Sequence, residues 1–366
     1  MFKIAKIEAF GVGLPLKAPI KMSSVIIEVA ENAIIRIEDT DGTVGWGEAT
    51  EAPTMNGETV GGMLGAIRFM KPLVEGYEVS DLSQIHVFLD NLLYGNHGAK
   101  SAVEIALLDL AGKRLGQPLY EILGGKVRDE APVLTMLAGG GKEAEVANAK
   151  MQADEGFVAF KVKIGALGPE EDLDRSHAAR EALGNDVRIS ADANQGYSRE
   201  EALKFSEGAA GAGLDFMEQL VGYADLDGMA ACAEASDVPL GADEGFHSMG
   251  DIRAHNDRGA AQGGSLKTIK LGGAFPVVEA AKMMDSLSMH VNLAGKVADS
   301  SIASAAISHL ALSLPQVDWD TSITNQYLVE DLVDDPITIS DGVVRMSDRP
   351  GLGVGPSDSL LAKYRL

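Results

Sequence analysis

At 366 residues the chain is longer than a typical single domain, and its 46% apolar and 23% charged residues are those of a folded globular protein, which excludes a disordered or fibrous one. The formal net charge of -23 predicts an acidic surface that repels phosphate backbones and anionic headgroups, so no nucleic-acid or membrane partner is expected. Cys232 is the only cysteine and residues 1–16 lack the pattern of a secretory signal, so we expect a cytoplasmic location.

The first part of the chain, residues 1–128, is predicted to be an α+β domain. Apolar and polar residues alternate in three segments, which indicates strands of a small antiparallel sheet: Ile4–Gly13, Ser24–Glu38 and Val44–Glu48. Apolar residues then recur at steps of three and four, most clearly in Ala99–Leu115, which is typical of helices. A sheet followed by helices predicts one compact α+β unit.

Residues 129–325 are predicted to form a barrel of parallel strands. Short apolar runs alternate there with longer amphipathic stretches, as strands alternate with crossover helices. The eight runs are Pro132–Met136, Val158–Ile164, Val187–Ala191, Phe216–Gln219, Val238–Ala242, Leu266–Leu271, His290–Leu293 and Val317–Thr321. An open doubly wound sheet is the alternative, but the glycine-rich dinucleotide turn typical of that fold is absent from the sequence. Residues 326–366 are expected to return to the first domain.

Charged residues stand at the ends of these runs, where barrel enzymes place their catalytic groups. Asp192, Glu218 and Asp243 lie 26 and 25 residues apart, about one strand and helix each, so we expect them to face one another. Three converging carboxylates would repel unless a cation joined them, and ligands that are all oxygen suit Mg²⁺. The single cysteine and the lack of a histidine cluster argue against zinc.

Lysines flank this group of carboxylates. Lys163 and Lys267 fall on predicted strands on either side of it, and Lys161 shares a strand face with Lys163, whose pKa it could lower by repulsion. A lysine with a lowered pKa can remove a proton, and the opposite lysine can return one. Each of these residues alone is more often a solvated side chain or a helix cap. Their occurrence together at regular strand ends favours a catalytic site.

The chain also carries a series of short motifs, inside and outside the predicted barrel: Gly45-Trp46-Gly47-Glu48, Gly112–Gly116, Leu123-Gly124-Gly125, Lys161-Val162-Lys163, Asp192-Ala193-Asn194, Phe216–Gln219, Ala242-Asp243-Glu244, Lys267–Gly273 and Pro350–Val354. Together these motifs resemble the enolase superfamily. Within it they are most similar to the muconate lactonizing enzyme (muconate cycloisomerase) subgroup of the mandelate racemase/muconate lactonizing enzyme family. The resemblance covers essentially the whole chain.

The resemblance implies an α/β fold, a (β/α)₇β TIM-like barrel with an α+β capping domain. It implies Mg²⁺, or Mn²⁺ in its place, on Asp192, Glu218 and Asp243. It also implies Lys163 and Lys267 as the acid/base pair, with Lys161 as an auxiliary, and a homo-oligomer, either a dimer or an octamer. In the mandelate racemase branch a histidine replaces the second lysine, but His290 begins its apolar run, so an ordinary role is expected for it.

The implied reaction moves the α-proton of a small carboxylate substrate through a metal-stabilised enolate. Cycloisomerisation and racemisation or epimerisation, including that of dipeptides or N-substituted amino acids, are the first candidates. A dehydratase or a lyase like o-succinylbenzoate synthase is the alternative. A non-catalytic binding protein is disfavoured, because both lysines and all three carboxylates are present. The sequence leaves open the substrate, the fate of the enolate and which lysine is the acid.

Substrate choice in this family depends on loops of the capping domain, here Leu14–Ser24 and Ala49–Thr59, and on the last strand ends. Asp318 and Asp320 resemble the Asp-x-Asp with which dipeptide epimerases bind an ammonium, although an aspartate there is often a helix cap. Lys296 either binds a second carboxylate or points to solvent. The candidate substrate-binding residues are therefore Asn194, Glu244, Lys296, Asp318 and Asp320.

Overall fold

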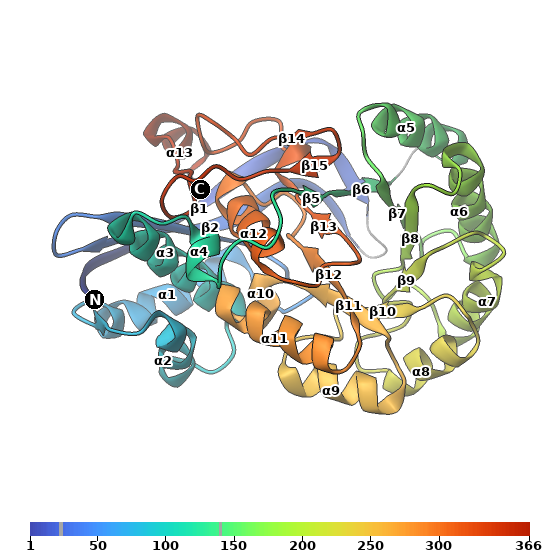
Figure 1. Ribbon diagram of the computed structural model, residues 1–366, viewed down its shortest axis with the longest axis horizontal. Coiled ribbons are helices and arrows are strands. Elements are labelled where there is room, and N and C mark those ends of the chain that lie inside the picture. The colour runs from blue at the N-terminus through green and yellow to red at the C-terminus, as the bar shows by residue number, and fades with distance from the viewer. Residues whose placement is uncertain (22–24, 139–140) are drawn as a thin grey trace.

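The computed structural model describes residues 1–21, 25–138 and 141–366 and has an antiparallel sheet with helices beside a ring of parallel strands (Figure 1). The antiparallel sheet has the strand order β3-β2-β1-β4. Its strands, with the helices of the same region, are β1 (Phe2–Lys21), β2 (Ile26–Asp39), β3 (Val44–Thr50), β4 (Glu78–Val79), α1 (Val60–Val74), η1 (Leu82–Gln84), α2 (Ile85–Leu92), α3 (His97–Leu115) and α4 (Leu119–Ile122).

Helix α3 packs so closely on β3 that the strand needs glycines at the contact. A Cβ atom on Gly47 would lie 1.9 Å from the carbonyl oxygen of Ala102, and one on Gly45 would lie 2.1 Å from that of Ala106. The two glycines alternate along β3, so both face the helix. The Gly-Trp-Gly-Glu motif therefore brings the next residue, Glu48, to the boundary with the barrel.

The second sheet has eight parallel strands in chain order, from β6 to β13, and a parallel bridge between Val133 and Thr321 joins its two edges. The prediction of a closed barrel with an α+β partner is confirmed. The strands are β6 (Leu134–Leu137), β7 (Ala159–Lys163), β8 (Arg188–Asp192), β9 (Phe216–Glu218), β10 (Leu240–Ala242), β11 (Gly263–Leu266), β12 (His290–Ala294) and β13 (Thr321–Ser322).

Helices form an outer layer around these strands (Figure 1). Each strand from β6 to β12 is followed by at least one helix in the described chain, whereas β13 leads into the C-terminal segment, as a (β/α)₇β barrel requires. The helices are α5 (Lys142–Asp154), α6 (Pro169–Leu183), α7 (Arg199–Ala209), α8 (Leu226–Glu234), α9 (Met249–Arg258), α10 (Thr268–Leu271), α11 (Ala274–Ser286) and α12 (Ser301–Ser313).

Two predicted strands are displaced in the structure. The sixth run, Leu266–Leu271, is mostly helix α10, and the strand β11 precedes it, because Gly263 and Gly264 leave room for the rings of Trp319 and Phe246. The eighth run, Val317–Thr321, lies before β13 and overlaps it only at its last residue. In both places the apolar residues are buried outside the strand that they were expected to form.

The first predicted substrate loop is also different. Residues 14–21 continue β1, so only the end of Leu14–Ser24 can be a loop, and its residues 22–24 lie outside the described part of the chain. The start of the predicted strand Ser24–Glu38 lies there too, and β2 begins at Ile26. The second predicted loop, Ala49–Thr59, is largely irregular and follows β3.

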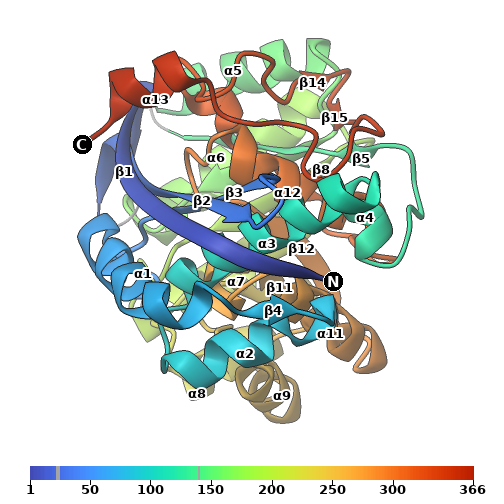
Figure 2. The same cartoon turned by 90° about the vertical axis from the view of Figure 1, so that its left-hand side faces the viewer.

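The C-terminal segment contacts both parts of the molecule. It contains η2 (Asn325–Tyr327), β14 (Ile339–Ser340), β15 (Val343–Val344) and α13 (Asp358–Tyr364), and β15 pairs with β5 (Ala131–Pro132) beside the barrel. Figure 2 shows α13 at one end of the long strand β1, where the amide of Leu366 donates to the carbonyl of Gly11 at 3.0 Å. Among the described residues, no helix is long and apolar enough to span a bilayer.

Candidate active site

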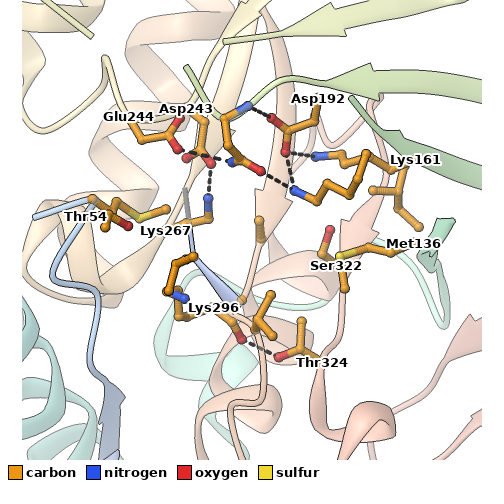
Figure 3. A pocket seen from close by; sticks show the side chains of 18 of the residues that line it. Thr54, Met136, Lys161, Asp192, Asp243, Glu244, Lys267, Lys296, Ser322 and Thr324 are labelled. Carbon is orange, nitrogen blue, oxygen red and sulfur yellow. Dashed lines mark hydrogen bonds and ion pairs between the residues drawn. The ribbon is translucent and has the colours of Figure 1, made fainter. Parts of the chain in front are cut away.

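A cavity of about 400 Å³ opens at the carboxyl ends of the barrel strands. Side chains from the strand ends line its wall, and Val25, Thr54 and Met55 of the first domain lie against it (Figure 3). Of the predicted site residues, the cavity wall contains Lys161, Lys163, Asp192, Asn194, Asp243, Glu244, Lys267 and Lys296. Glu218 contacts one of these, Lys161, from strand β9, which is separated from the strand of Lys161 by β8.

The two lysines of β7 point into the cavity because residues two apart lie on one face of a strand. Lys161 forms an ion pair with Glu218 and lies 4.0 Å from the carboxylate of Asp192. The Nζ of Lys163 is 2.5 Å from Asp192 Oδ2 and donates to Asn194 Oδ1 at 2.8 Å. Burial lowers the pKa of Lys161, but Glu218 and Asp192 outweigh this effect and raise it above its usual value. These ion pairs oppose the simple repulsion that we expected between the two lysines.

The three carboxylates occupy equivalent places on neighbouring strands. Asp192 and Glu218 end β8 and β9 and are paired in register, and Asp243 directly follows β10. Each is only 2% exposed. Burial raises the pKa of Asp192 and of Asp243, but the lysines beside them hold both values below the usual range. Asp192 and Asp243 are therefore ionised at neutral pH, and each of the three carboxylates contacts a lysine.

Lys267 follows β11 and forms an ion pair with Asp243. Strand β11 lies four places from β7 in an eight-strand barrel, so Lys267 faces Lys163 across the cavity. A further lysine, Lys270 of α10, donates to Asp243 Oδ1 at 2.7 Å and to the carbonyl of Ser265 at 2.8 Å. Sequence reasoning gave Lys270 no role, although its three-residue spacing from Lys267 is that of one helical face.

The donor set of this site can be compared with the needs of a metal ion. In the described part of the chain, no three acidic, histidine or cysteine side chains are gathered closely enough to ligate one ion as placed, and each of the three carboxylates contacts a lysine instead. The chemistry of the set fits Mg²⁺ nevertheless, because it consists of buried carboxylate oxygens on three adjacent strands. Glu244 adds a buried oxygen, Oε2, without a hydrogen-bond partner in the described chain.

Asn194 and Glu244 join the ends of β8 and β10. The amide Nδ2 of Asn194 donates to Glu244 Oε1 at 3.1 Å, and its backbone N–H donates to Asp192 Oδ1 at 2.9 Å. Asn194, Gln195 and Gln219 have positive φ angles of 41°, 66° and 37°. Such backbone conformations are strained for residues other than glycine and are commonly found at functional sites.

Lys296 follows β12 and is 8% exposed. Its backbone is held on both sides, because its N–H donates to Asp299 Oδ2 at 2.8 Å and its carbonyl accepts from Thr324 Oγ1 at 2.5 Å. Burial and the charge of Lys267 lower the pKa of Lys296 to about 8. The prediction that it might point to solvent is wrong, because its side chain lines the cavity.

Asp318 and Asp320 do not reach the cavity. Asp318 accepts a hydrogen bond from Nδ1 of His290 at 2.5 Å, and Asp320 forms an ion pair with Arg188. His290 and Arg188 begin β12 and β8, so these contacts lie toward the amino end of the barrel. The expectation that the two aspartates bind a substrate ammonium is dropped, because the predicted eighth run precedes β13.

The end of β13 instead supplies uncharged polar groups that sequence reasoning missed. Ser322, Thr324 and Tyr327 line the cavity, and Figure 3 shows Thr324 across it from Asp192. The alternation of polar and apolar residues in Thr321-Ser322-Ile323-Thr324 was the available signal.

Two family models together match most of the chain. The model for the mandelate racemase/muconate lactonizing enzyme N-terminal domain matches residues 5–124, and the enolase C-terminal domain-like model matches residues 144–360. The fold is thus that of the enolase-like barrel enzymes. Within that class, the chain belongs to the mandelate racemase/muconate lactonizing enzyme family, and the resemblance inferred from its motifs is confirmed.

Relatives match over nearly the full length. Muconate cycloisomerase 1 of Pseudomonas putida is 31% identical over 99% of this chain and 98% of that protein. The N-succinyl-L-Arg/Lys racemase of Bacillus cereus is 29% identical over 98% and 97%. The crystal structure of muconate lactonizing enzyme from Pseudomonas fluorescens, complexed with muconolactone, matches with a TM-score of 0.95 at 32% identity and covers 100% of both chains. These relatives are isomerases, in agreement with the predicted enzyme class.

Proposed function

We propose that this protein moves the α-proton of a small carboxylate substrate in a racemisation, epimerisation or cycloisomerisation. The observation that carries the proposal is the placement of Lys163 and Lys267 on opposite walls of one cavity, with three buried carboxylates between them. The names of the relatives, a racemase and a cycloisomerase, are consistent with such chemistry.

In this proposal the two lysines act on opposite faces of the substrate. One lysine, in its neutral form, removes the α-proton, and the ammonium of the other delivers a proton to the other face. Lys161 stays charged beside Glu218 and Asp192 and adds positive charge at the cavity floor. Mg²⁺, with Mn²⁺ as a substitute, would be held by Asp192, Glu218 and Asp243, and it supplies positive charge beside the reacting carboxylate.

For assembly and location we propose a homo-oligomer, a dimer or an octamer, in the cytoplasm. The resemblance to the family supports the assembly, and the single cysteine of the sequence, which fits a reducing compartment, supports the location. Light scattering of the purified protein measures its oligomeric state directly.

The test of the proposed function is hydrogen exchange in D₂O with Mg²⁺, followed by proton NMR. Pools of N-acyl amino acids, dipeptides, proline derivatives and muconate-like diacids are offered as single enantiomers where they have an α-proton. We expect one pool to lose its α-proton signal or to form a lactone. Release of a leaving group would assign the related lyase reaction instead. A folded, metal-loaded protein that changes none of the pools would contradict the proposal.

Single-lysine variants then identify the two bases. Because Lys163 and Lys267 face opposite sides of the α-carbon, Lys163→Ala should slow exchange of one enantiomer by about 100-fold or more and leave that of the other largely intact. Lys267→Ala should give the reverse preference. Lys282→Ala, on the exposed side of α11, is the matched control. Equal exchange of both enantiomers in Lys163→Ala would remove this residue from the mechanism.

A further inference from the structure

Lys296 differs from the other lysines of the cavity in having no anionic partner. The three other lysines that line the cavity, Lys161, Lys163 and Lys267, are each ion-paired with one of the strand-end carboxylates. Lys270, outside the cavity wall, is paired with Asp243 as well. Across the described residues, the Nζ of Lys296 has neither a hydrogen bond nor an ion pair, although the residue is only 8% exposed. The side chain lines the cavity, so an anion that enters the cavity could pair with this ammonium.

The groups that face Lys296 do not offer that partner. Asp299 is the nearest acid, but its oxygens accept from Thr50 Oγ1 at 2.7 Å and from the backbone N–H of Lys296 itself. Asp243 is held by Lys267 and Lys270, and the remaining charges that act on Lys296 are those of Lys267 and Lys163. The ammonium therefore lies in a positive part of the cavity, whose free charge favours an anion.

The position of Lys296 separates it from the proposed reacting centre. Figure 3 shows it across the cavity from Asp192, on the side of Thr324. It also lines a second, smaller cavity of about 150 Å³ between β2 and the segment after β3, and Val25, Thr54 and Val297 line both cavities. Lys296 thus stands where the main cavity continues toward the first domain.

We propose that Lys296 binds a second anionic group of the substrate, distinct from the reacting carboxylate, and so selects dianionic substrates. This inference rests on the proposed function, because it assumes that the reacting carboxylate lies between Lys163 and Lys267. The hydrogen bonds of the Lys296 backbone to Asp299 and Thr324 hold the backbone from which this side chain extends, which lowers the entropy cost of recognition.

Calorimetry with simple probes tests the proposal on the Mg²⁺-loaded protein. The probes are succinate, glutarate and adipate, each paired with the monoacid of the same chain length: butyrate, valerate and hexanoate. We expect at least one diacid to bind about 10-fold or more tightly than its monoacid, as an added charge pair in a desolvated site would give. If no diacid is preferred by the wild-type protein, the inference is overturned.

Variants assign the preference to Lys296. Lys296→Met should remove the preference for the diacid and leave monoacid binding unchanged, while Lys296→Arg should retain part of it, because arginine keeps the charge but does not give up a proton. Lys282→Met is the matched control for the loss of one exposed positive charge. If Lys296→Met still prefers the diacid, the inference is overturned. If Lys296→Met does not fold, Lys296→Arg decides: a folded Lys296→Arg that has lost the whole preference for the diacid also overturns the inference.

The two proposals fail separately. The probes carry no test of proton transfer, so α-proton exchange without a Lys296-dependent diacid preference would overturn only the role of Lys296. If Lys296 selects diacids but no substrate pool exchanges its α-proton, the inference about the anion site stands and the catalytic proposal is contradicted.

Discussion

Glu218 shows how one side chain can serve two partners at the strand ends. Its Oε2 contacts Lys161, and its Oε1 accepts from Ser265 at 2.7 Å, so both oxygens are oriented before any ion binds. A glutamine at this position would keep the shape and lose the charge. We therefore use this residue to test the proposed metal site.

Glu218→Gln should weaken Mg²⁺ binding by about 10-fold or more, because a carboxylate ligand is replaced by a neutral amide. Titration calorimetry of the folded variant against the wild-type protein measures the change. Glu207→Gln, an exposed change on α7, controls for the loss of one negative charge from the acidic surface. An unaltered affinity in Glu218→Gln would take this residue out of the proposed ligand set.

The residues at the strand ends were predictable because a single property, their place after an apolar run, fixes them. Lys163, Asp192 and Asp243 follow from this rule together with the strand period of two. The prediction for Asp318 was wrong because its apolar run precedes β13 and is not itself a strand. Lys270 was missed because Leu266–Leu271 was expected to be a strand, in which Lys267 and Lys270 lie on opposite faces, whereas residues 268–271 form helix α10.

At the scale of elements, two buried glutamates of the first domain lie on the N-termini of barrel helices. Glu48, in β3, accepts hydrogen bonds from the backbone of Ser300 and Ala303 at the start of α12, each at 2.9 Å. Glu104 of α3 accepts from Ala274 and Phe275 at the start of α11. Free N–H groups and the helix dipole favour a carboxylate at such positions.

Glu48→Ala should lower the free energy of unfolding by about 2–4 kcal/mol, because it leaves the buried donors of Asn32, Ser300 and Ala303 without an acceptor. Urea unfolding followed by circular dichroism measures this difference. Glu207→Ala, at an exposed helical position, should stay within about 0.5 kcal/mol of the wild type. A Glu48→Ala variant as stable as this control would show that the contact adds nothing to the union of the two parts.

Most strands could be located from the sequence, but two could not. Six of the eight apolar runs overlap their strands within two residues at each end, because a strand buried on both faces is a continuous apolar segment. Strand β11 begins with Gly263 and Gly264, and a pair of glycines is more typical of a turn than of a strand. The apolar residues after Lys267 form α10. Hydrophobicity reports burial there and does not distinguish a strand from a helix.

For the whole molecule, composition and alternation were sufficient to predict the barrel and its α+β partner. They could not predict how the two parts meet, since that depends on contacts such as those of Glu48 and Glu104, which are far apart in sequence from their partners. The net charge of -23 has a further consequence at this scale. Repulsion among surface carboxylates and the burial of other carboxylates both lower the stability of the folded protein as the pH rises.

Burial is the main cause that raises the pKa of Glu104 to about 8; the N–H groups of Ala274 and Phe275 oppose it, and nearby Glu279 and Asp90 add to it. A folded-state pKa above the unfolded value of about 4.5 means that the folded protein binds the extra proton between these two pH values. Stability then falls as pH rises through that window and levels off above pH 8.

We therefore expect the urea midpoint to fall between pH 6 and pH 8.5, and to fall less in Glu104→Gln, which has no proton to lose at this position. Surface repulsion is screened by salt, whereas a buried carboxylate is screened much less, so the difference between wild type and variant should persist in 0.5 M NaCl. If salt abolishes the pH dependence and Glu104→Gln has the same slope as the wild type, the effect comes from the acidic surface alone. A slope that remains in salt and is reduced only in the variant assigns it to the carboxylate that joins α3 to α11.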